Sequence, residues 1–417
     1  MKDEPLRRTG RDLAARAAYL ERMEKTDIFI SGAGIAGMIL AALLAKRGHT
    51  VTVCDPSTPA DAMSDEDSDL RSTAYLAPSI AVLEEAGLWQ HLAPDATPLE
   101  ALRVMDSTGW PPRQTATRTF RPGDLDLPAF GQNVMNWRAH RILLDALNDA
   151  SRVNLRLGVG FRSMLARENE VRVTLTDGSR LSAALVIGAD GRNSPVRGAA
   201  GIEARDRRYG QKALAFACTH ADPHQHVSTE VYNGGGAFVT VPLPDHEGQH
   251  ASSIVWMSTG ARIAELQAMN AEAFDAELTE RALHIMGPMQ RITPMRVWPI
   301  ITRTADALTA RRTALVAEAA HVLPPIGAQG LNTSIADIAA LADAIEGGDP
   351  GRDAALETYA RSRHRDMAIR ATAIDAYNRL CQADSGPLQA LRSAGLKAVH
   401  DLGPLRRNVM MAGMGGA

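Results

Sequence analysis

The sequence predicts an α/β protein: a discontinuous Rossmann-like domain with an inserted antiparallel sheet and helices at the C-terminus. Three observations predict it. A buried strand, a glycine turn, a helix and a second strand follow one another over residues 27–54, as in the β-α-β unit of a parallel sheet. Strand-like segments crowd residues 213–257. Two further strand-then-turn motifs, at 186–197 and 317–332, flank that block, so the second domain must interrupt the first.

Size and composition agree with two domains. The chain has 417 residues, of which 45% are hydrophobic, and that is more than one ordinary compact domain needs. The net charge is -3, with both signs spread along the chain, which argues against a nucleic-acid partner. Cys54, Cys218 and Cys381 lie far apart and form no CxxC pair, so we expect reduced thiols, with neither disulfides nor a metal site.

The N-terminal part does not have the pattern expected of a signal peptide. Residues 1–25 mix both charge signs and lack the apolar core of a signal peptide, so we expect a flexible extension, with Met23 as an alternative start. The uncharged segment 28–45 is about long enough to cross a bilayer, but glycines and a serine crowd its first half. A buried strand, a turn and a buried helix explain it better, and we expect a cytoplasmic protein.

The other elements follow from periodicity and turn residues. We expect helices at 37–47, 77–88, 138–150, 272–286 and 333–345, and a helical remainder to about 409. We expect strands at 27–30, 50–54, 171–175, 180–187, 213–219, 228–232, 237–241, 252–257 and 313–316. The acidic stretch 61–69 predicts a loop, and the prolines of 111–128 predict an irregular excursion.

The first chemical motif is the turn Gly32-Ala33-Gly34-Ile35-Ala36-Gly37. Gly32 permits a tight turn, Gly34 lets the backbone approach a pyrophosphate, and Gly37 lets helix and strand pack closely. The helix N-terminus then faces the phosphate charge. Asp55 ends the next strand, near the place of a ribose-binding acid. The set predicts dinucleotide binding without separating FAD from NAD; the alternatives are a packing turn and, for Asp55, a strand-end cap.

The second motif runs from Val186 to Arg197 and follows a buried strand. It places Asp190 and Gly191 at a turn, which puts an acid beside a flexible stretch of backbone. Taken alone, a plain Asp-Gly turn is an equally good interpretation.

The third motif runs from Ala317 to Asn332. A buried strand delivers Glu318, a rigid Pro324-Pro325 loop follows, and a glycine-rich stretch enters a helix. Backbone N–H groups at such a helix start can face an electron-rich ring carbonyl or the negative charge of a reduced flavin. For His321 we favour a hydrogen-bonded loop organiser over proton transfer, and no second ligand at a suitable spacing supports a metal role.

These three motifs together resemble the para-hydroxybenzoate-hydroxylase-like flavoprotein monooxygenases, and more narrowly the flavin hydroxylases of ubiquinone biosynthesis. The segment Asp69-Leu70-Arg71-Ser72-Thr73-Ala74 is similar to that subfamily's segment after the second strand. Further positions that match the subfamily are Ser79, Leu83, Gly87-Leu88-Trp89, Gln211, Pro223-His224, Gly236, Pro242-Leu243, Trp256, Leu402 to Arg407 and Met410-Met411. The resemblance runs from about residue 26 to the C-terminus.

The resemblance implies a glutathione-reductase-type FAD-binding domain and a set of cofactor contacts. Residues expected to hold the ADP half of FAD are Gly32, Gly34, Gly37 and Asp55. Arg71 and Arg138 would lie along the cofactor, with a solvated surface arginine as the alternative for each. Asp190 and Gly191 would belong to a motif that FAD and NAD(P)H share. Residues expected at the ribityl chain and the isoalloxazine are Glu318, Gly330, Leu331 and Asn332. Residues expected to act in catalysis on the reactive side of the flavin are Pro324, Pro325 and Asn332.

One departure stands out. The family has Gly-Asp where this chain has Ala317-Glu318. The glutamate keeps an acceptor but is a methylene longer, and the alanine adds a methyl group where the cofactor passes closely. We therefore expect FAD binding to be shifted or weakened.

The implied reaction is the hydroxylation of an aromatic ring. NAD(P)H would reduce FAD, reduced FAD would trap O2 as a C4a-hydroperoxide, and that electrophile would attack the ring. The substrate we expect is a polyprenylated phenol of ubiquinone biosynthesis, reached by peripheral contact with the inner membrane or by handover within a quinone-biosynthesis complex. One alternative is a hydroxylase of a soluble small aromatic compound. The other is a non-catalytic flavin-fold subunit of such a complex, which the Ala317-Glu318 departure motivates.

The resemblance also suggests domain boundaries. We expect an N-terminal extension at 1–25 and a C-terminal helical segment at 376–417. The discontinuous FAD-binding domain would comprise 26–100, 130–205 and 290–375. The substrate domain would comprise 101–129 and 206–289.

Overall fold

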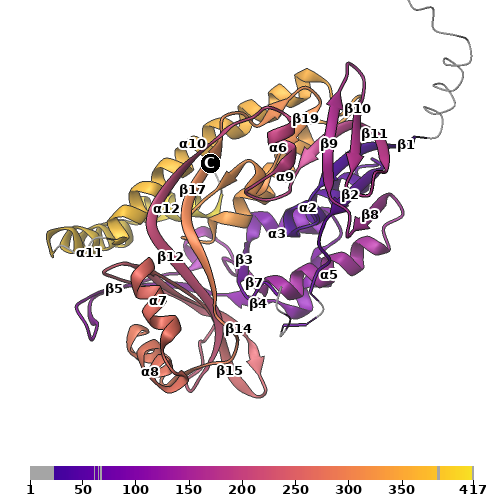
Figure 1. Cartoon of the computed structure of the whole chain (residues 1–417). Coiled ribbons are helices and arrows are strands. Elements are labelled where there is room, and N and C mark those ends of the chain that lie inside the picture. Colours follow the sequence, from indigo (N-terminus) through magenta and orange to yellow (C-terminus); the bar gives the residue numbers. More distant parts are fainter. Residues whose placement is uncertain (1–22, 61, 64, 66–67, 383–385, 416–417) are drawn as a thin grey trace, which may run out of the picture.

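Two large sheets and long C-terminal helices make up the protein (Figure 1). The structure, a computed structural model, describes residues 23–60, 62–63, 65, 68–382 and 386–415. Most of the expected N-terminal extension and part of the loop expected at 61–69 lie outside the described residues. The arrangement confirms the predicted fold class.

The first sheet has eight strands and a parallel centre. Its strands are β1 (Glu24–Ser31), β2 (Val51–Asp55), β8 (Val153–Leu157), β9 (Phe161–Ala166), β10 (Val171–Leu175), β11 (Arg180–Gly188), β18 (Thr309–Ala310) and β19 (Thr313–Leu315). Their order is β18-β19-β11-β1-β2-β8, and the antiparallel pair β10 and β9 continues from β11. β1 pairs in parallel with β2 and β11, and β11 pairs in parallel with β19. The carboxyl ends of β1, β2, β11 and β19 therefore meet at one edge.

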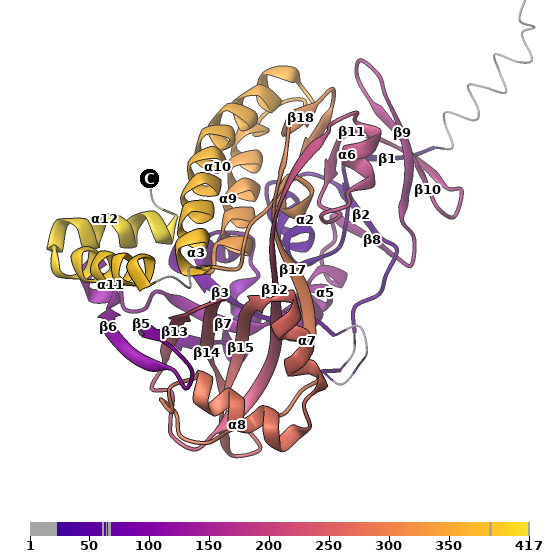
Figure 2. The same ribbon diagram turned by 60° about the vertical axis from the view of Figure 1, so that its left-hand side comes forward.

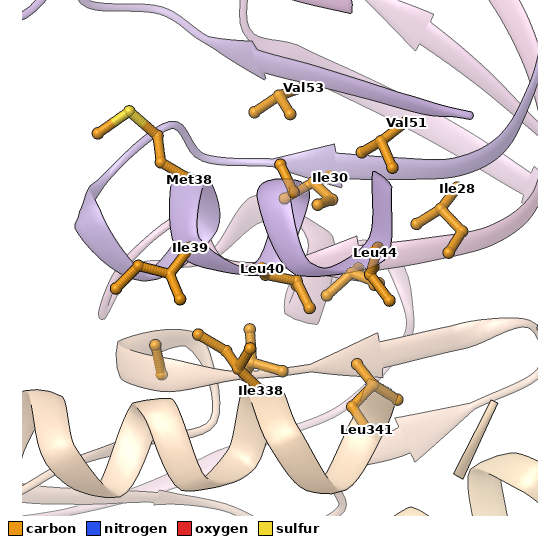
Figure 3. Close-up of a cluster of buried hydrophobic side chains, with 14 of the residues drawn as sticks. Ile28, Ile30, Met38, Ile39, Leu40, Leu44, Val51, Val53, Ile338 and Leu341 are labelled. Atoms are coloured by element: carbon orange, nitrogen blue, oxygen red, sulfur yellow. The ribbon is translucent and has the colours of Figure 1, made fainter. Parts of the chain in front are cut away.

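The core of this half lies between the parallel strands and two helices, α2 (Ile35–Lys46) and α9 (Gln329–Ala344). Figure 3 shows α2 between β1 and β2 on one side and α9 on the other. Ile30, Leu40 and Ile338 are completely buried. The uncharged segment 28–45 is thus a buried strand, a turn and a buried helix, as predicted. No helix in the described part of the chain is long and apolar enough to cross a membrane.

Shorter elements complete this half. A three-stranded sheet pairs β7 (Gly131–Met135) with β3 (Ser72–Leu76) and β4 (Thr97–Leu99). The helices are α3 (Ala77–Glu85), α4 (Trp89–Leu92), α5 (Asn136–Asn148) and α6 (Pro195–Ala199). α5 packs against α2, so its apolar face, predicted from periodicity, joins the same core.

The second sheet has nine strands and is mostly antiparallel. Its strands are β5 (Ala101–Thr108), β6 (Arg113–Phe120), β12 (Ala204–His220), β13 (Val227–Asn233), β14 (Gly236–His246), β15 (Gln249–Thr259), β16 (Met289–Arg291), β17 (Arg296–Ala305) and β20 (His321–Val322). The main order is β20-β17-β12-β15-β14-β13-β5-β6. β17 and β20 come from the range 290–375, which the boundaries suggested above give to the FAD-binding domain; those boundaries stay a prediction.

The two faces of the second sheet pack against different parts of the chain. On one face, Phe216, Phe238 and Trp256 pack against α7 (Gly260–Ala268) and α8 (Ala271–Arg281). On the other face, Tyr232 and Met257 share a cluster with residues from the loop before α9 and from the C-terminal helices. The second face therefore looks toward the first half of the molecule.

Three helices end the chain: α10 (Asp353–Gln382), α11 (Gly386–Asp401) and α12 (Gly403–Met414). Figure 2 shows α10 running beside α9 and then on toward α11 and α12, which pack side by side. Through α10, the helical tail connects the parallel sheet to the antiparallel sheet.

Two sequence expectations were wrong in detail. Residues 111–128 are not irregular throughout, because β6 pairs with β5 as an antiparallel edge strand. Its alternation is hidden by polar residues on an exposed edge, and two prolines precede it. The helix expected to reach residue 286 ends at Arg281, where Leu283 and His284 adopt positive φ angles. The three cysteines, expected to be reduced thiols, are free, and all three are buried; burial raises the pKa of Cys54 to about 12.

Candidate active site

The glycine turn after β1 is shaped for close backbone contact. Gly32 has a φ of +106°, and a Cβ there would lie 2.4 Å from the carbonyl oxygen of Ala189. A Cβ on Gly37 would lie 2.0 Å from the carbonyl oxygen of Gly32. A Cβ on Gly34 would instead meet nothing within 4 Å. Packing therefore requires glycine at positions 32 and 37, whereas Gly34 leaves open space at the N-terminus of α2.

Asp55 braces this turn from the end of β2. Its Oδ2 accepts a hydrogen bond from the backbone N–H of Ala33 at 2.8 Å. Its Oδ1 accepts from the backbone N–H and the hydroxyl of Ser57, at 2.9 Å and 2.6 Å. His140 donates to the Ala33 carbonyl at 2.7 Å. Asp55 thus holds the turn in shape, and its contact with a ribose stays a prediction.

The second motif lies beside the first. The backbone N–H of Ala189 donates to the carbonyl of Ser31 at 2.8 Å, which joins the ends of β11 and β1. Asp190 accepts from the backbone N–H of Val196 at 3.2 Å. Burial raises the pKa of Asp190, and the nearby hydroxyls of Ser194 and Ser31 offset part of that effect. Asp190 and Gly191 therefore stand next to the glycine turn, as expected for a shared motif.

Arg197 ties the second motif to the third. It is buried, and its guanidinium donates to the carbonyl oxygens of Ala319 and Arg192, both at 2.9 Å. Buried arginine that bonds to two backbone carbonyls fixes both segments at once. The motifs at 186–197 and 317–332, which are far apart in sequence, therefore lie against each other.

Glu318 lies near arginines from two other segments of the chain. Its Oε2 lies 3.5 Å from the Nε of Arg192. Burial lowers the pKa of Arg71, but its ion pair with Asp69 raises it above the ordinary value, and the charge of Glu318 adds a smaller effect in the same direction. The Arg71 guanidinium also lies 4.8 Å from the ring centre of Trp298 on β17. Glu318 is therefore placed among arginines, beside the edge where the strands of the first sheet end.

The departure at Ala317 has a visible backbone consequence. Ala317 has a φ of +55° and is buried. A left-handed conformation costs a non-glycine residue about 1–2 kcal/mol. The turn of η3 (Ala317–Ala319) therefore has the backbone shape that glycine favours, while the chain supplies alanine.

The loop between β20 and α9 carries the residues expected near the flavin ring. The carbonyl of Pro324 accepts a bond from the Ile326 N–H at 2.8 Å, which tightens the loop. Asn332 accepts from the Leu76 N–H at 2.9 Å and donates to the carbonyls of Ala74 and Ala328, each at 2.7 Å. Asn332 thus fastens the start of α9 to β3, and its role in catalysis stays a prediction.

The other residues expected near the flavin ring take different positions. A Cβ on Gly330 would meet nothing within 4 Å, so this residue leaves open space at the first turn of α9. Leu331 instead packs against the main core. Pro325 lies in the loop itself, and the contacts of all three residues with FAD stay predictions.

His321 is held by a buried network beneath this loop. Its Nε2 bonds to Oδ2 of Asp337, and Arg363 donates to the other oxygen of Asp337 at 2.7 Å. Burial alone would raise the pKa of Asp337, but His321 and Arg363 outweigh it and hold that pKa below its ordinary value. His321 therefore has the geometry of a loop organiser. The described residues contain no group of histidines, cysteines and acids able to hold a metal ion.

The two arginines expected along the cofactor have acidic partners. Arg71 makes a two-pronged ion pair with Asp69, at 2.8 Å and 2.7 Å. Arg138 pairs with Asp95 at 2.7 Å and is half exposed. Arg71 lies at the site beside Glu318, whereas Arg138 is engaged at the surface. Contact of either residue with FAD stays a prediction.

Several residues that shape the site were not predicted. Asp337 and Arg363 lie on helices whose sequence shows only helical periodicity, and Trp298 lies on a strand that was not predicted. A buried charged residue on an apolar helix face is the one signal that could have indicated Asp337. Glu230, a buried carboxylate on β13, was also missed.

The chain is similar to known proteins over most of its length. A family model described as an FAD binding domain matches residues 25–372. Ubiquinone hydroxylase UbiL of Rhodospirillum rubrum is 32% identical over 394 residues, which cover 93% of this chain and 89% of that protein. The chain belongs to the ubiquinone-biosynthesis flavin hydroxylases. This flavin hydroxylase is also 29% identical to 3-demethoxyubiquinol 3-hydroxylase of Escherichia coli, over 94% of this chain and 99% of that one.

Solved structures agree on the fold of the flavin hydroxylase. The crystal structure of p-nitrophenol 4-monooxygenase PnpA from Pseudomonas putida matches with a TM-score of 0.76 at 17% identity, over 94% of this chain and 99% of that chain. The structure of PqsL from Pseudomonas aeruginosa, a probable FAD-dependent monooxygenase, matches with a TM-score of 0.72 at 23% identity, over 90% of this chain and 100% of that chain. At these identities the likeness shows the fold alone.

The flavin hydroxylase is an FAD-dependent monooxygenase, and its site fits FAD. The open space at Gly34 stands at the N-terminus of α2, whose first turn contains no acidic residue and no side-chain cap. Free N–H groups and the helix dipole there suit a pyrophosphate. Bound FAD supplies the oxygen-activating redox chemistry, and NAD(P)H is the reductant typical of the family. The predicted family, enzyme class and cofactor are thus confirmed.

Proposed function

We propose that this monooxygenase hydroxylates the ring of a polyprenylated phenol in ubiquinone biosynthesis, with NAD(P)H as reductant. The observation that carries the proposal is the 32% identity to a ubiquinone hydroxylase across 93% of the chain. The geometry supports it, because the three motifs meet at one edge of the parallel sheet. Ile326 of the third motif shares an apolar cluster with Tyr232, Met257 and Ile300 on one face of the second sheet.

The chain's own residues would divide the work as follows. Gly34 and the N-terminus of α2 would bind the pyrophosphate, and Asn332 would keep the first turn of α9 in place beside the flavin ring. The substrate ring would lie between the Pro324-Pro325 loop and the sheet face that contains Met257 and Ile300. An apolar surface there would exclude water and accept an alkyl chain.

We also propose that the protein meets its substrate at a membrane surface or within a quinone-biosynthesis complex. Exposed apolar side chains gather on α11, on α12 and at the residue between them: Leu388, Leu391, Leu402, Leu405, Val409 and Met411. On the inner side of α12, Met410 and Met414 share a cluster with Ile326 of the flavin-facing loop. One helix therefore joins an exposed apolar surface to the interior beside the site, a suitable route for an alkyl chain.

A deletion strain tests the proposal. We expect mass spectrometry of its quinone intermediates to show a prenylated precursor that lacks one ring hydroxyl. The wild-type gene should restore the product, and a Gly34→Val variant should not. If the intermediates are unchanged by deletion, the proposal is wrong.

The two alternatives give different results in the same strain. If the protein is a non-catalytic subunit, the Gly34→Val variant should restore quinone synthesis in the deletion strain, because that role would not need bound FAD. A hydroxylase of a soluble aromatic compound would leave quinones unchanged, and a small phenol would stimulate its NAD(P)H oxidation.

A further inference from the structure

Gln329 lies where the flavin-facing loop, residues 323–328, enters α9. The residue is 9% exposed, and both polar atoms of its side chain have partners. The amide nitrogen donates to the carbonyl oxygen of Gly327 at 3.0 Å and to that of Gly413, near the end of α12, at 2.8 Å. The amide oxygen accepts from the guanidinium of Arg370 on α10 at 3.0 Å. One planar group therefore connects the loop with two C-terminal helices.

The loop turns sharply just before Gln329. Gly327 and Ala328 have consecutive positive φ angles of +63° and +57°. The left-handed region is unfavourable for a residue other than glycine, so Ala328 needs support from its surroundings. The Gln329 amide binds the carbonyl of Gly327, and the Asn332 amide binds that of Ala328. Gln329 thus holds the loop on one side and α12 on the other.

The end of α12 receives a second bond from the same place. The guanidinium of Arg370 donates to the carbonyl oxygen of Ala412 at 3.3 Å, next to the bond from Gln329 to Gly413. Carbonyl groups in the last turn of a helix have no partner one turn further on, so side-chain donors can bind them. The last turn of α12 is therefore fastened by an amide and a guanidinium that also bind each other.

A chain of ion pairs extends from Arg370 to the other end of the loop. Asp366 lies between Arg370 and Arg363, at 2.9 Å and 3.0 Å. Arg363 in turn pairs with Asp337, which is the carboxylate partner of His321 on β20. His321 precedes the loop, so one network anchored on α10 reaches both of its ends.

We propose that Gln329 is a positioning residue that couples the end of α12 to the flavin-facing loop, so that a movement of α12 changes the surroundings of bound FAD. Only an amide side chain supplies two N–H donors and an acceptor in one planar group. An exposed helix thereby acts on the flavin through one buried side chain. The proposal rests on FAD binding at this loop and not on the identity of the substrate or of the surface that α12 contacts.

Hydrogen exchange of the FAD-loaded full chain tests the link from Gln329 to α12. In Gln329→Met, which keeps the bulk without the bonds, peptides from the last turn of α12 should exchange about threefold to tenfold faster, as expected for the loss of one hydrogen bond. Gln329→Glu keeps an acceptor for Arg370 but loses both donors, so it should show the same change. Gln267→Met, at an exposed position on α7, should exchange as the wild type does.

The absorption spectrum of bound FAD tests the link from α12 to the flavin, which a merely structural role would not affect. Met414→Ala removes a buried contact at the end of α12 and should shift the flavin bands in the wild-type background. In the Gln329→Met background the same substitution should add no further shift, because the coupling residue is gone. Met411→Ala, on the exposed side of the same turn, should leave the bands unchanged.

Three results would each overturn the coupling. The first is wild-type exchange at α12 in both Gln329 variants. The second is a flavin spectrum that does not respond to Met414→Ala. The third is an equal shift in both backgrounds, because the effect would then pass through the apolar cluster that Met414 shares with Ile326. A variant that loses FAD is compared with the wild-type apoprotein, since the bond to Gly413 lies within the chain itself.

Discussion

The Oε2 of Glu318 lies 3.5 Å from the Nε of Arg192, so the third motif faces the second across the edge of the parallel sheet. The residue before Glu318 is Ala317, with its φ of +55°. The family's Gly-Asp pair would fit this backbone without strain. The departure predicted to affect FAD binding is therefore also a strained position, and both effects can be measured.

Ala317→Gly should stabilise the protein. Removing the strain of an alanine in the left-handed conformation should raise the free energy of unfolding by about 1–2 kcal/mol. Glycine also has more conformational freedom in the unfolded chain, which lowers the free energy of unfolding by about 0.4–1 kcal/mol. A net gain of about 0.5–1 kcal/mol should appear as a higher melting temperature by calorimetry. Ala319→Gly, two residues on in the same turn, has no positive φ to relieve and should lower stability. Equal shifts for the two variants would contradict the strain.

The same variant addresses cofactor affinity. Removing the Ala317 methyl group, alone or with Glu318→Asp, should tighten FAD binding if that methyl group displaces the cofactor. Equilibrium dialysis or flavin fluorescence of the apoprotein during FAD titration measures the dissociation constant. If the double variant binds FAD no more tightly than wild type, the departure has no effect on the cofactor.

Gly34→Val should abolish FAD binding without unfolding the protein. A Cβ at Gly34 meets no protein atom within 4 Å, so the side chain would occupy only the space intended for the pyrophosphate. The purified variant should lack flavin absorbance and keep its far-ultraviolet circular dichroism. Gly395→Val, at an exposed and equally open position on α11, should retain flavin. Flavin retained by Gly34→Val would place the pyrophosphate elsewhere.

Asp337 should make stability depend on acid pH. Its folded pKa lies below the ordinary value of 3.8 because His321 and Arg363 outweigh burial. A depressed pKa contributes stability that is present above the unfolded value and is lost as pH falls through the folded value. Unfolding measured between neutral pH and strongly acidic pH should therefore show a loss that Asp337→Asn lacks.

The same substitution should also destabilise the protein at neutral pH. Asp337→Asn removes the buried carboxylate that His321 and Arg363 share and leaves Arg363 paired with Asp366 alone, at a cost of up to about 3–5 kcal/mol. Asp343→Asn on the same helix is a matched control, because the Asp343 side chain is 67% exposed and its pair with Arg47 is at the surface. The control should cost less than about 1 kcal/mol. Similar losses for both variants would contradict the importance of the buried network.

Local sequence signals were enough for the β-α-β opening and for dinucleotide binding, whereas FAD in particular was implied by the resemblance of the three motifs together. The turn from Gly32 to Gly37 is encoded within six residues, and the structure explains two of its glycines by backbone contacts of 2.4 Å and 2.0 Å. The helix α5 could be predicted in the same way, because its apolar residues recur at helical spacing within one continuous segment. Features encoded in consecutive residues can be predicted from them.

Contacts between distant segments were not predictable in the same way. β5 pairs in parallel with β13, from Ala101 against Val227 onward, and no local pattern specifies that partner. His321, Asp337 and Arg363 each have an ordinary local interpretation and become a network only after folding. Glu230 looks like one polar residue in an alternating strand. Only the folded structure reveals that it is buried.

The exposed apolar side of α12 should govern attachment to lipid. Leu405 and Val409 lie four residues apart on α12, and Leu402 directly precedes the helix; the three side chains are 39%, 44% and 57% exposed. We expect the full chain to sediment with vesicles of phosphatidylethanolamine and phosphatidylglycerol. Replacing the three residues by glutamine should weaken that binding by at least about tenfold, because each substitution removes an apolar side chain that would be buried in lipid.

The charged residues near α12 predict how salt should affect binding to vesicles. Arg406 and Arg407 pair with Asp124 and Asp126, so they are not free to bind anionic headgroups, and added salt should change binding little. Ile369→Gln, at a 61% exposed position on α10, alters apolar exposure away from α12 and should leave binding unchanged. If the triple variant binds vesicles as wild type does, α12 is not the contact. Binding lost at moderate salt would instead indicate electrostatic attachment, because apolar burial in lipid is not screened by salt.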